Sequence, residues 1–182
     1  MKNLTQTRHK FSISNKLARI VWQLTYYFLF WPFFLRFFRK WRIFLLNCFG
    51  AKIHWTATIH SNVKIWAPWN LEVGAFSCIG PSVDCYNQGK IKIGKNVTIS
   101  QKTYLCASSH DYTKVSNDLL LKPISIEDRV WVAADAYIGP GVEIKEGSVI
   151  GARSVVTSNL PAWMVCVGFP CKPIKKREFT NA

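Results

Sequence analysis

Four histidines are the side chains of this sequence best suited to move a proton near neutral pH: His9, His54, His60 and His110. A neutral imidazole can take the proton of a hydroxyl group and so turn that oxygen into a nucleophile. His9 lies in a polar, basic start, and His54 and His60 have no polar motif around them, which favours structural or solvent-facing roles. His110 lies in the polar loop SSHDY at 108–112 and is the candidate base; a solvated loop histidine is the alternative reading.

Two neighbours of His110 could share in its chemistry. Asp111 could orient the imidazole or contact a substrate, or it could simply cap a turn. Cys106 could act as a thiolate nucleophile that forms a covalent intermediate, although packing against the wall of the fold also explains it. The six cysteines contain no CxxC pair, which favours reduced thiols and predicts no metal site.

A six-residue repeat after Gly50 must position these side chains. Aliphatic residues are followed four positions later by a small or β-branched residue. The clearest run is contiguous from Ile126 to Val155, and its pairs are Ile126/Val130, Val132/Ala136, Ile138/Val142, Ile144/Ser148 and Ile150/Ser154. Such hexads predict a triangular coil in which each aliphatic residue points inward and three hexads close one turn. The expected fold is mainly β: a single-stranded, parallel β-helix over 51–170.

The repeat is interrupted three times. Its phase slips by two residues at 65–73 and at 85–93, and a loop near 106–125 separates Leu105 from Ile126. We expect each interruption to leave the prism at a corner. Asp84 and Asn87 lie in the stretch VDCYNQG around the second slip and would project near the cleft of His110 as candidate substrate-binding residues.

The N-terminal third has a different composition. Residues 1–16 are polar and basic and are predicted to be unstructured. Residues 17–50 are rich in aromatic and basic side chains and predict amphipathic helices, broken at Pro32 and ended at Gly50. These helices could lie in a membrane interface, through residues 17–49, or could pack on their own domain or on neighbouring copies. Residues 171–182 form a basic tail.

Charge predicts anionic partners at both ends of the chain. Lys and Arg number 24 and Asp and Glu number 10, with the excess in the first 52 residues and in the tail. No nucleic-acid-binding module accompanies this charge, so we expect a phosphorylated cofactor or an anionic membrane rather than nucleic acid. No signal peptide is evident, which predicts a cytoplasmic protein, either free or peripheral on the inner face of the cell membrane.

Residues 51–175 resemble the hexapeptide-repeat acetyltransferases, most closely the subgroup named for colanic acid biosynthesis. The resemblance rests on several motifs in a fixed order, namely FGAKI at 49–53, SSHDY at 108–112, VWVAADAYIGPGVEI at 130–144, VIGARSVVT at 149–157 and GFPCKPI at 168–174. It implies a left-handed β-helix, a homotrimer, and direct transfer of acetyl from acetyl-CoA to a sugar or glycan hydroxyl. In the family motif, His110 occupies the position of the catalytic base.

The resemblance also implies where the cofactor binds. Small residues that let the pantetheine arm approach the backbone correspond to Ala133, Ala134, Gly151 and Ala152. Trp131 matches a position close to the cofactor, although it could equally cover the hydrophobic prism. Thr157, Lys172 and Lys175 would meet the nucleotide end, but many relatives carry arginine at these tail positions, which puts directional phosphate contacts in doubt.

Three functions remain open at this point. The leading hypothesis is O-acetylation of a sugar in exopolysaccharide, capsule or lipopolysaccharide assembly. The second is acetylation of a free sugar or another small molecule. The third is a catalytically silent β-helix that binds a nucleotide or serves as a scaffold, because a β-helix by itself establishes only a fold.

Overall fold

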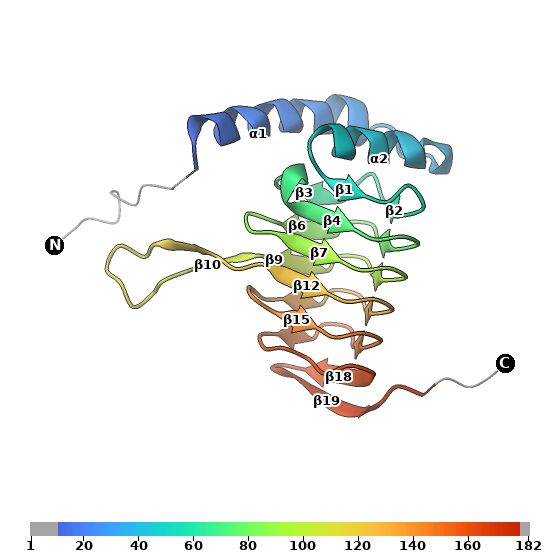
Figure 1. The fold of residues 1–182 in the computed structure, drawn as a ribbon, viewed down its shortest axis with the longest axis vertical. Helices are drawn as coiled ribbons and strands as arrows, with labels where there is room; N and C mark the ends of the chain where they lie inside the picture. Colours follow the sequence, from blue (N-terminus) through green and yellow to red (C-terminus); the bar gives the residue numbers. More distant parts are fainter. Residues whose placement is uncertain (1–10, 179–182) are drawn as a thin grey trace.

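The computed structural model describes residues 11–178 and shows a three-sided prism of stacked coils with helices across one end (Figure 1). The helical segments are α1 (Ile13–Thr25), η2 (Tyr26–Phe30), η3 (Arg36–Phe38) and α2 (Arg39–Cys48). Each coil then adds one short strand to each of three parallel sheets. The result is the mainly β, hexad-based helix that the repeat predicts.

The three sheets form the faces of the prism. The first face contains β1 (Lys52–Ile53), β4 (Leu71–Val73), β7 (Ile91–Ile93), β12 (Ile124–Ile126) and β15 (Glu143–Ile144). The second contains β2 (Thr58–Ile59), β5 (Cys78–Ile79), β8 (Thr98–Ile99), β13 (Trp131–Val132), β16 (Val149–Ile150), β18 (Met164–Gly168) and β19 (Cys171–Lys176). The third contains β3 (Lys64–Ile65), β6 (Asp84–Tyr86), β9 (Tyr104–Cys106), β14 (Tyr137–Ile138) and β17 (Val155–Val156).

We call the edge between the first and second faces the first corner, the edge between the second and third faces the second corner, and the edge between the third and first faces the third corner. The aliphatic hexad residues point into the prism, where Ile59, Ile79 and Ile99 are fully buried one above another. Burying this apolar column is the main source of stability.

The register explains the slips in the repeat. Thr58 pairs with Cys78, twenty residues later, whereas Trp131 pairs with Val149, eighteen residues later. The two additional residues of each early coil lie at the third corner. In the first coil they belong to the stretch that forms η4 (Pro68–Asn70). The longer interruption is a hairpin of β10 (Ser108–His110) and β11 (Leu119–Leu121), which projects from the side of the prism at the third corner (Figure 1).

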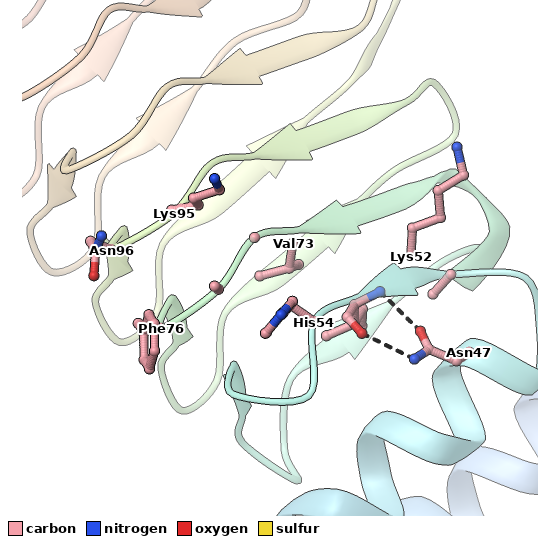
Figure 2. Close-up of a pocket in the computed structure, with 11 residues that line it drawn as sticks. Asn47, Lys52, His54, Val73, Phe76, Lys95 and Asn96 are labelled. Atoms are coloured by element: carbon pink, nitrogen blue, oxygen red, sulfur yellow. Dashed lines mark hydrogen bonds between the residues drawn. The ribbon is translucent and has the colours of Figure 1, made fainter.

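The helical end is tied to the first coil by side chains that bind its backbone carbonyl groups. The amide of Asn47 pairs with both the N–H and the carbonyl of Ile53 in β1, as Figure 2 shows. The Nε atom of Arg42 donates to the carbonyl of Ile59 in β2, at 2.9 Å. The indole of Trp22 donates to the carbonyl of Ile65 in β3, at 2.8 Å. On each of the three faces, the backbone of the first strand is thus hydrogen-bonded by a different side chain of the helical end.

Three boundaries differ from the sequence-based expectation. Residues 13–16 are helical rather than unstructured, because the Ser12 side chain caps α1 by accepting from the amide of Asn15; residues 1–10 lie outside the described residues. The chain does break at Pro32, but the second helical segment begins only at Arg36. Residues 171–176 of the expected tail form β19, antiparallel to β18.

Among residues 11–178, no helix is long and apolar enough to cross a membrane.

Candidate functional site

His110 lies at the end of β10, on the exposed hairpin. In the hairpin it pairs with Leu119 of β11, and its Nδ1 atom lies 2.8 Å from the carbonyl oxygen of Asn117. A carbonyl oxygen can only accept, so Nδ1 must carry the hydrogen. In the neutral ring the lone pair is therefore on Nε2, the state that a general base requires.

Asn117 is a residue of the site that sequence reasoning missed. Its backbone has a positive φ of 46°, a conformation that asparagine adopts more readily than most residues, and the turn points its carbonyl at the imidazole. An asparagine within a polar loop is a signal for such a turn. The contact with His110 depends on the hairpin register, which the sequence pattern does not show.

The carboxylate of Asp111 is occupied by its own turn. It accepts hydrogen bonds from the backbone and hydroxyl of Thr113 and lies 3.4 Å from the ammonium of Lys114. These groups, the Thr113 hydroxyl first, lower the pKa of Asp111. These contacts match the turn-cap alternative, and a contact of Asp111 with substrate or with the imidazole stays a prediction.

Asn87 lies at the third corner, but its side chain points inward and is fully buried. Its Oδ1 atom accepts from the backbone amides of Trp66 and Ala67, and its Nδ2 atom donates to the carbonyl of Ala67. This amide closes the turn between the first and second coils. The prediction of a substrate-binding Asn87 is therefore wrong, because no polar atom of the side chain is left for a ligand.

Asp84 lies on the third face, in a pocket between this face and the helices. The pocket has a volume of about 410 Å³ and is lined by Trp22, Gln23, Tyr26, Tyr27, Trp31, Lys64, Ile65, Trp66, Asp84 and Tyr86. Burial raises the pKa of Asp84, and the nearby Lys64 offsets part of that effect. Asp84 pairs in register with Tyr104 of β9, the strand that leads into the hairpin of His110. A carboxylate among aromatic rings suits a ligand with both polar and apolar surfaces.

The small residues predicted to line a cofactor groove meet at the second corner. Ala133 and Ala134 form this corner in the fourth coil, and Gly151 and Ala152 form it one coil later. A Cβ atom added to Gly151 would lie 2.7 Å from the side chain of Val167, so a larger residue there would require Val167 to move.

The remaining predicted cofactor residues lie in two places. Trp131 is 46% exposed on the second face, where its indole donates to the hydroxyl of Ser100. Lys172 and Lys175 lie on β19, which borders the same face, and both are exposed. Thr157 lies apart from them, at the third corner beside Gly139. Within one chain, the small residues and the lysines therefore lie at the second corner and on the second face, whereas His110 and Thr157 lie at the third corner.

A larger hollow of about 790 Å³ lies at the first corner, around His54 (Figure 2). Nδ1 of His54 accepts from the backbone amide of Thr56 and also contacts its hydroxyl, at 2.9 Å. The imidazole thus stabilises its own turn, in agreement with a structural role. Burial and the charge of Arg42 lower the pKa of the other early histidine, His60.

Comparison with known proteins identifies the family. A family model described as bacterial transferase hexapeptide (six repeats) matches residues 123–158. WcaF of Escherichia coli strain K12, which carries the provisional name colanic acid biosynthesis acetyltransferase, is 44% identical over 142 residues, or 78% of each chain. The chain belongs to the hexapeptide-repeat acetyltransferases.

Solved structures of hexapeptide-repeat acetyltransferases share the fold. A maltose O-acetyltransferase from Clostridium difficile 630 matches with a TM-score of 0.81 and 26% identity, over 92% of this chain and 90% of that one. A galactoside acetyltransferase in complex with coenzyme A matches with a TM-score of 0.82 and 21% identity, over 98% and 92%, which is a likeness of fold. The prism of this acetyltransferase is accordingly a left-handed β-helix.

Proposed function

We propose that this acetyltransferase moves an acetyl group from acetyl-CoA to a hydroxyl of a sugar or glycan, with His110 as the general base. The observation that carries the proposal is the hydrogen bond from Nδ1 of His110 to the carbonyl of Asn117, which leaves Nε2 free on an exposed hairpin. The names of WcaF and of the maltose enzyme support a sugar acceptor, and the galactoside enzyme was solved with coenzyme A. WcaF further suggests a role in exopolysaccharide, capsule or lipopolysaccharide assembly.

In the proposed reaction, Nε2 of His110 takes the proton of the acceptor hydroxyl while that oxygen attacks the thioester carbonyl carbon. The tetrahedral intermediate then collapses, the carbon–sulfur bond breaks, and the imidazolium returns the proton to the departing thiolate of CoA. No covalent enzyme intermediate is needed. Cys106 packs beside the hairpin, with its thiol 3.3 Å from the carbonyl of Ser108, which gives it a structural role.

The cofactor is proposed to run along the second corner. The residues at this corner have small side chains or none, so that the pantetheine arm can approach the backbone; they are Ala133, Ala134, Gly151 and Ala152. Trp131 would border this path, and Lys172 and Lys175 on the neighbouring strand would attract the phosphates. Asp84 remains a candidate for contact with the acceptor, since the aromatic walls of its pocket could pack on a sugar ring.

A homotrimer would complete this site. Within one chain, His110 lies at the third corner and the small residues lie at the second. A cofactor at the second corner of one copy would meet the hairpin of a neighbouring copy if three prisms pack around a common axis, and such closed symmetry is the usual arrangement for soluble oligomers. Thr157, at the same corner as the hairpin, would then face the cofactor of the neighbouring copy.

The test is the release of free CoA from acetyl-CoA in the presence of free sugars and of lipid-linked glycans, for the wild type and His110→Ala. Acceptor-dependent release that falls by roughly 10²- to 10⁴-fold in the variant supports a general base at this position. His110→Asn serves as a control, because its amide can still donate to the carbonyl of Asn117 but cannot accept the proton. Equal rates in wild type and variants would exclude His110 as the base. Lack of both acetyl-CoA binding and turnover would favour a silent scaffold.

A further inference from the structure

The helical end of the molecule, α1 to α2, carries more exposed apolar surface than a folded domain normally leaves in water. Helix α1 is apolar on two sides. Trp22 on one side is buried against the first coil, with Phe30 of η2 beside it, while the opposite side leaves Leu17, Leu24 and their neighbours exposed. An amphipathic helix normally turns its apolar residues toward the core and its polar residues toward water. In this structure the outer side has no cover.

The exposed apolar residues continue through the next segments. Phe28 and Phe37 are each 71% exposed, although both belong to helical segments of the ordered structure. The full set on this surface, which we call the cap surface, is Ile13, Leu17, Ile20, Val21, Leu24, Tyr27, Phe28, Leu29, Trp31, Phe34, Leu35, Phe37 and Phe44. Exposed apolar side chains concentrated in one part of a fold are typical of interaction sites.

Charge indicates which partner fits. All ten Asp and Glu residues of the chain lie at Glu72 or beyond, so the cap surface carries no acidic residue. Lys16, Arg36 and Lys40 are exposed among its apolar side chains. A shallow hollow lined by Leu35, Arg36, Phe37, Arg39 and Lys40 brings three cationic side chains beside two apolar ones. Headgroup phosphates above acyl chains present the complementary pattern.

We propose that the cap surface docks on an anionic lipid bilayer, with the aromatic side chains inserted at the level of the headgroups. A second copy of the same surface fits less well, because two uniformly basic faces would repel each other. The position of the surface also suits a bilayer, since the helices lie across the end of the prism (Figure 1).

The docked orientation fixes the height of the hairpin. Strands of neighbouring coils lie about 4.8 Å apart and a helix is about 10 Å thick, so the hairpin after the third coil stands roughly 20 Å from the lipid surface. A sugar carried on a lipid could reach this height. This last step rests on the proposed function, whereas docking itself can be measured without acetyl-CoA.

The experiment is flotation of the full chain with vesicles of phosphatidylcholine and phosphatidylglycerol, or of phosphatidylcholine alone. We expect binding to the anionic vesicles that weakens with added salt. Phe28→Ser together with Phe37→Ser should lower the vesicle affinity by about tenfold or more. Phe76→Ser is the matched control, because Phe76 is 69% exposed on the prism, away from the helices. Melting curves check that the variants fold.

Charge is tested separately. Lys16→Glu, Arg36→Glu and Lys40→Glu together should abolish the preference for anionic vesicles. The same change of charge at Lys172, Lys175 and Lys176 on β19 should leave it intact. The proposal is overturned by a wild type that does not float, by equal binding of the double phenylalanine variant, or by greater loss from the β19 triple. A change of oligomeric state in the phenylalanine variant without vesicles would show that another copy covers the surface instead.

Discussion

Replacing Asn87 with alanine should destabilise the protein without touching its chemistry. The buried amide bonds three backbone groups, but two of them have a second partner: the amide of Trp66 also donates to Cys85, and the carbonyl of Ala67 also accepts from Asn70. The amide of Ala67 has only Asn87 among the described residues. It would be left buried and unsatisfied.

The size of the effect follows from this count. One buried, unpaired N–H costs about 1–3 kcal/mol, and each weakened hydrogen bond adds up to about 1 kcal/mol. We therefore expect a loss of about 3 kcal/mol, which for a chain of this size corresponds to a fall in Tm of roughly 6–12 °C. Thermal unfolding followed by circular dichroism measures it.

Asn62→Ala is the matched control. The side chain of Asn62 makes an analogous pair of hydrogen bonds with Ser82, one coil later, but at an exposed position. Water can replace those bonds, so the expected loss is within about 0.5 kcal/mol. Equal Tm values for the two variants would refute the reasoning. A raised KM for the sugar with an unchanged Tm in Asn87→Ala would return this residue to the acceptor site.

Three further predictions concern ionisable groups. Cys106→Ala should retain acetyl transfer close to the wild-type rate, measured as CoA release, whereas a route through an acetylated thiol would lose turnover almost completely. Asp84→Asn should raise Tm at pH 7, because burial raises the pKa of Asp84 on folding and so disfavours its charged form. The gain in Tm should vanish as the pH falls below the ordinary aspartate pKa, where the side chains of both proteins are neutral. A gain that persists at that pH would contradict the electrostatic cause. A thiol reagent should modify the exposed Cys48 first, while the buried Cys85 and Cys166 react only in denaturant. Burial raises the pKa of both buried thiols, that of Cys166 to about 11. Early modification of Cys85 would show that the prism opens.

The coils could be predicted from the sequence because each hexad is a local pattern. An aliphatic residue at every sixth position can be buried only if the chain turns at regular intervals, and no distant contact is needed to infer this. The slips at 65–73 and 85–93 were recognised for the same reason. The start of α1 could also have been found, since Ser12 is a favourable N-cap before an apolar run, but the polar composition of the first residues hid it.

The site was only partly predictable. His110 could be placed on a loop, but its partner Asn117 depends on how the hairpin pairs. The roles of Asn87 and Asp111 do not follow from the sequence, because a polar side chain near a corner can serve either a ligand or the turn itself. The structure shows that the backbone amide of Ala67 donates to Asn87, and that Thr113 and Lys114 bind the carboxylate of Asp111.

The hydrogen bonds from Asn47, Arg42 and Trp22 to the first coil have a consequence for how the protein behaves when it is shortened. A stack of parallel strands ends in a row of unpaired backbone groups, and such an exposed edge is a template on which another chain can add. At the first coil these three side chains occupy the template on every face. A chain trimmed to the β-helix alone would therefore lose its protection against end-to-end growth, and its aggregation would reflect the missing helices rather than a failure of the prism to fold.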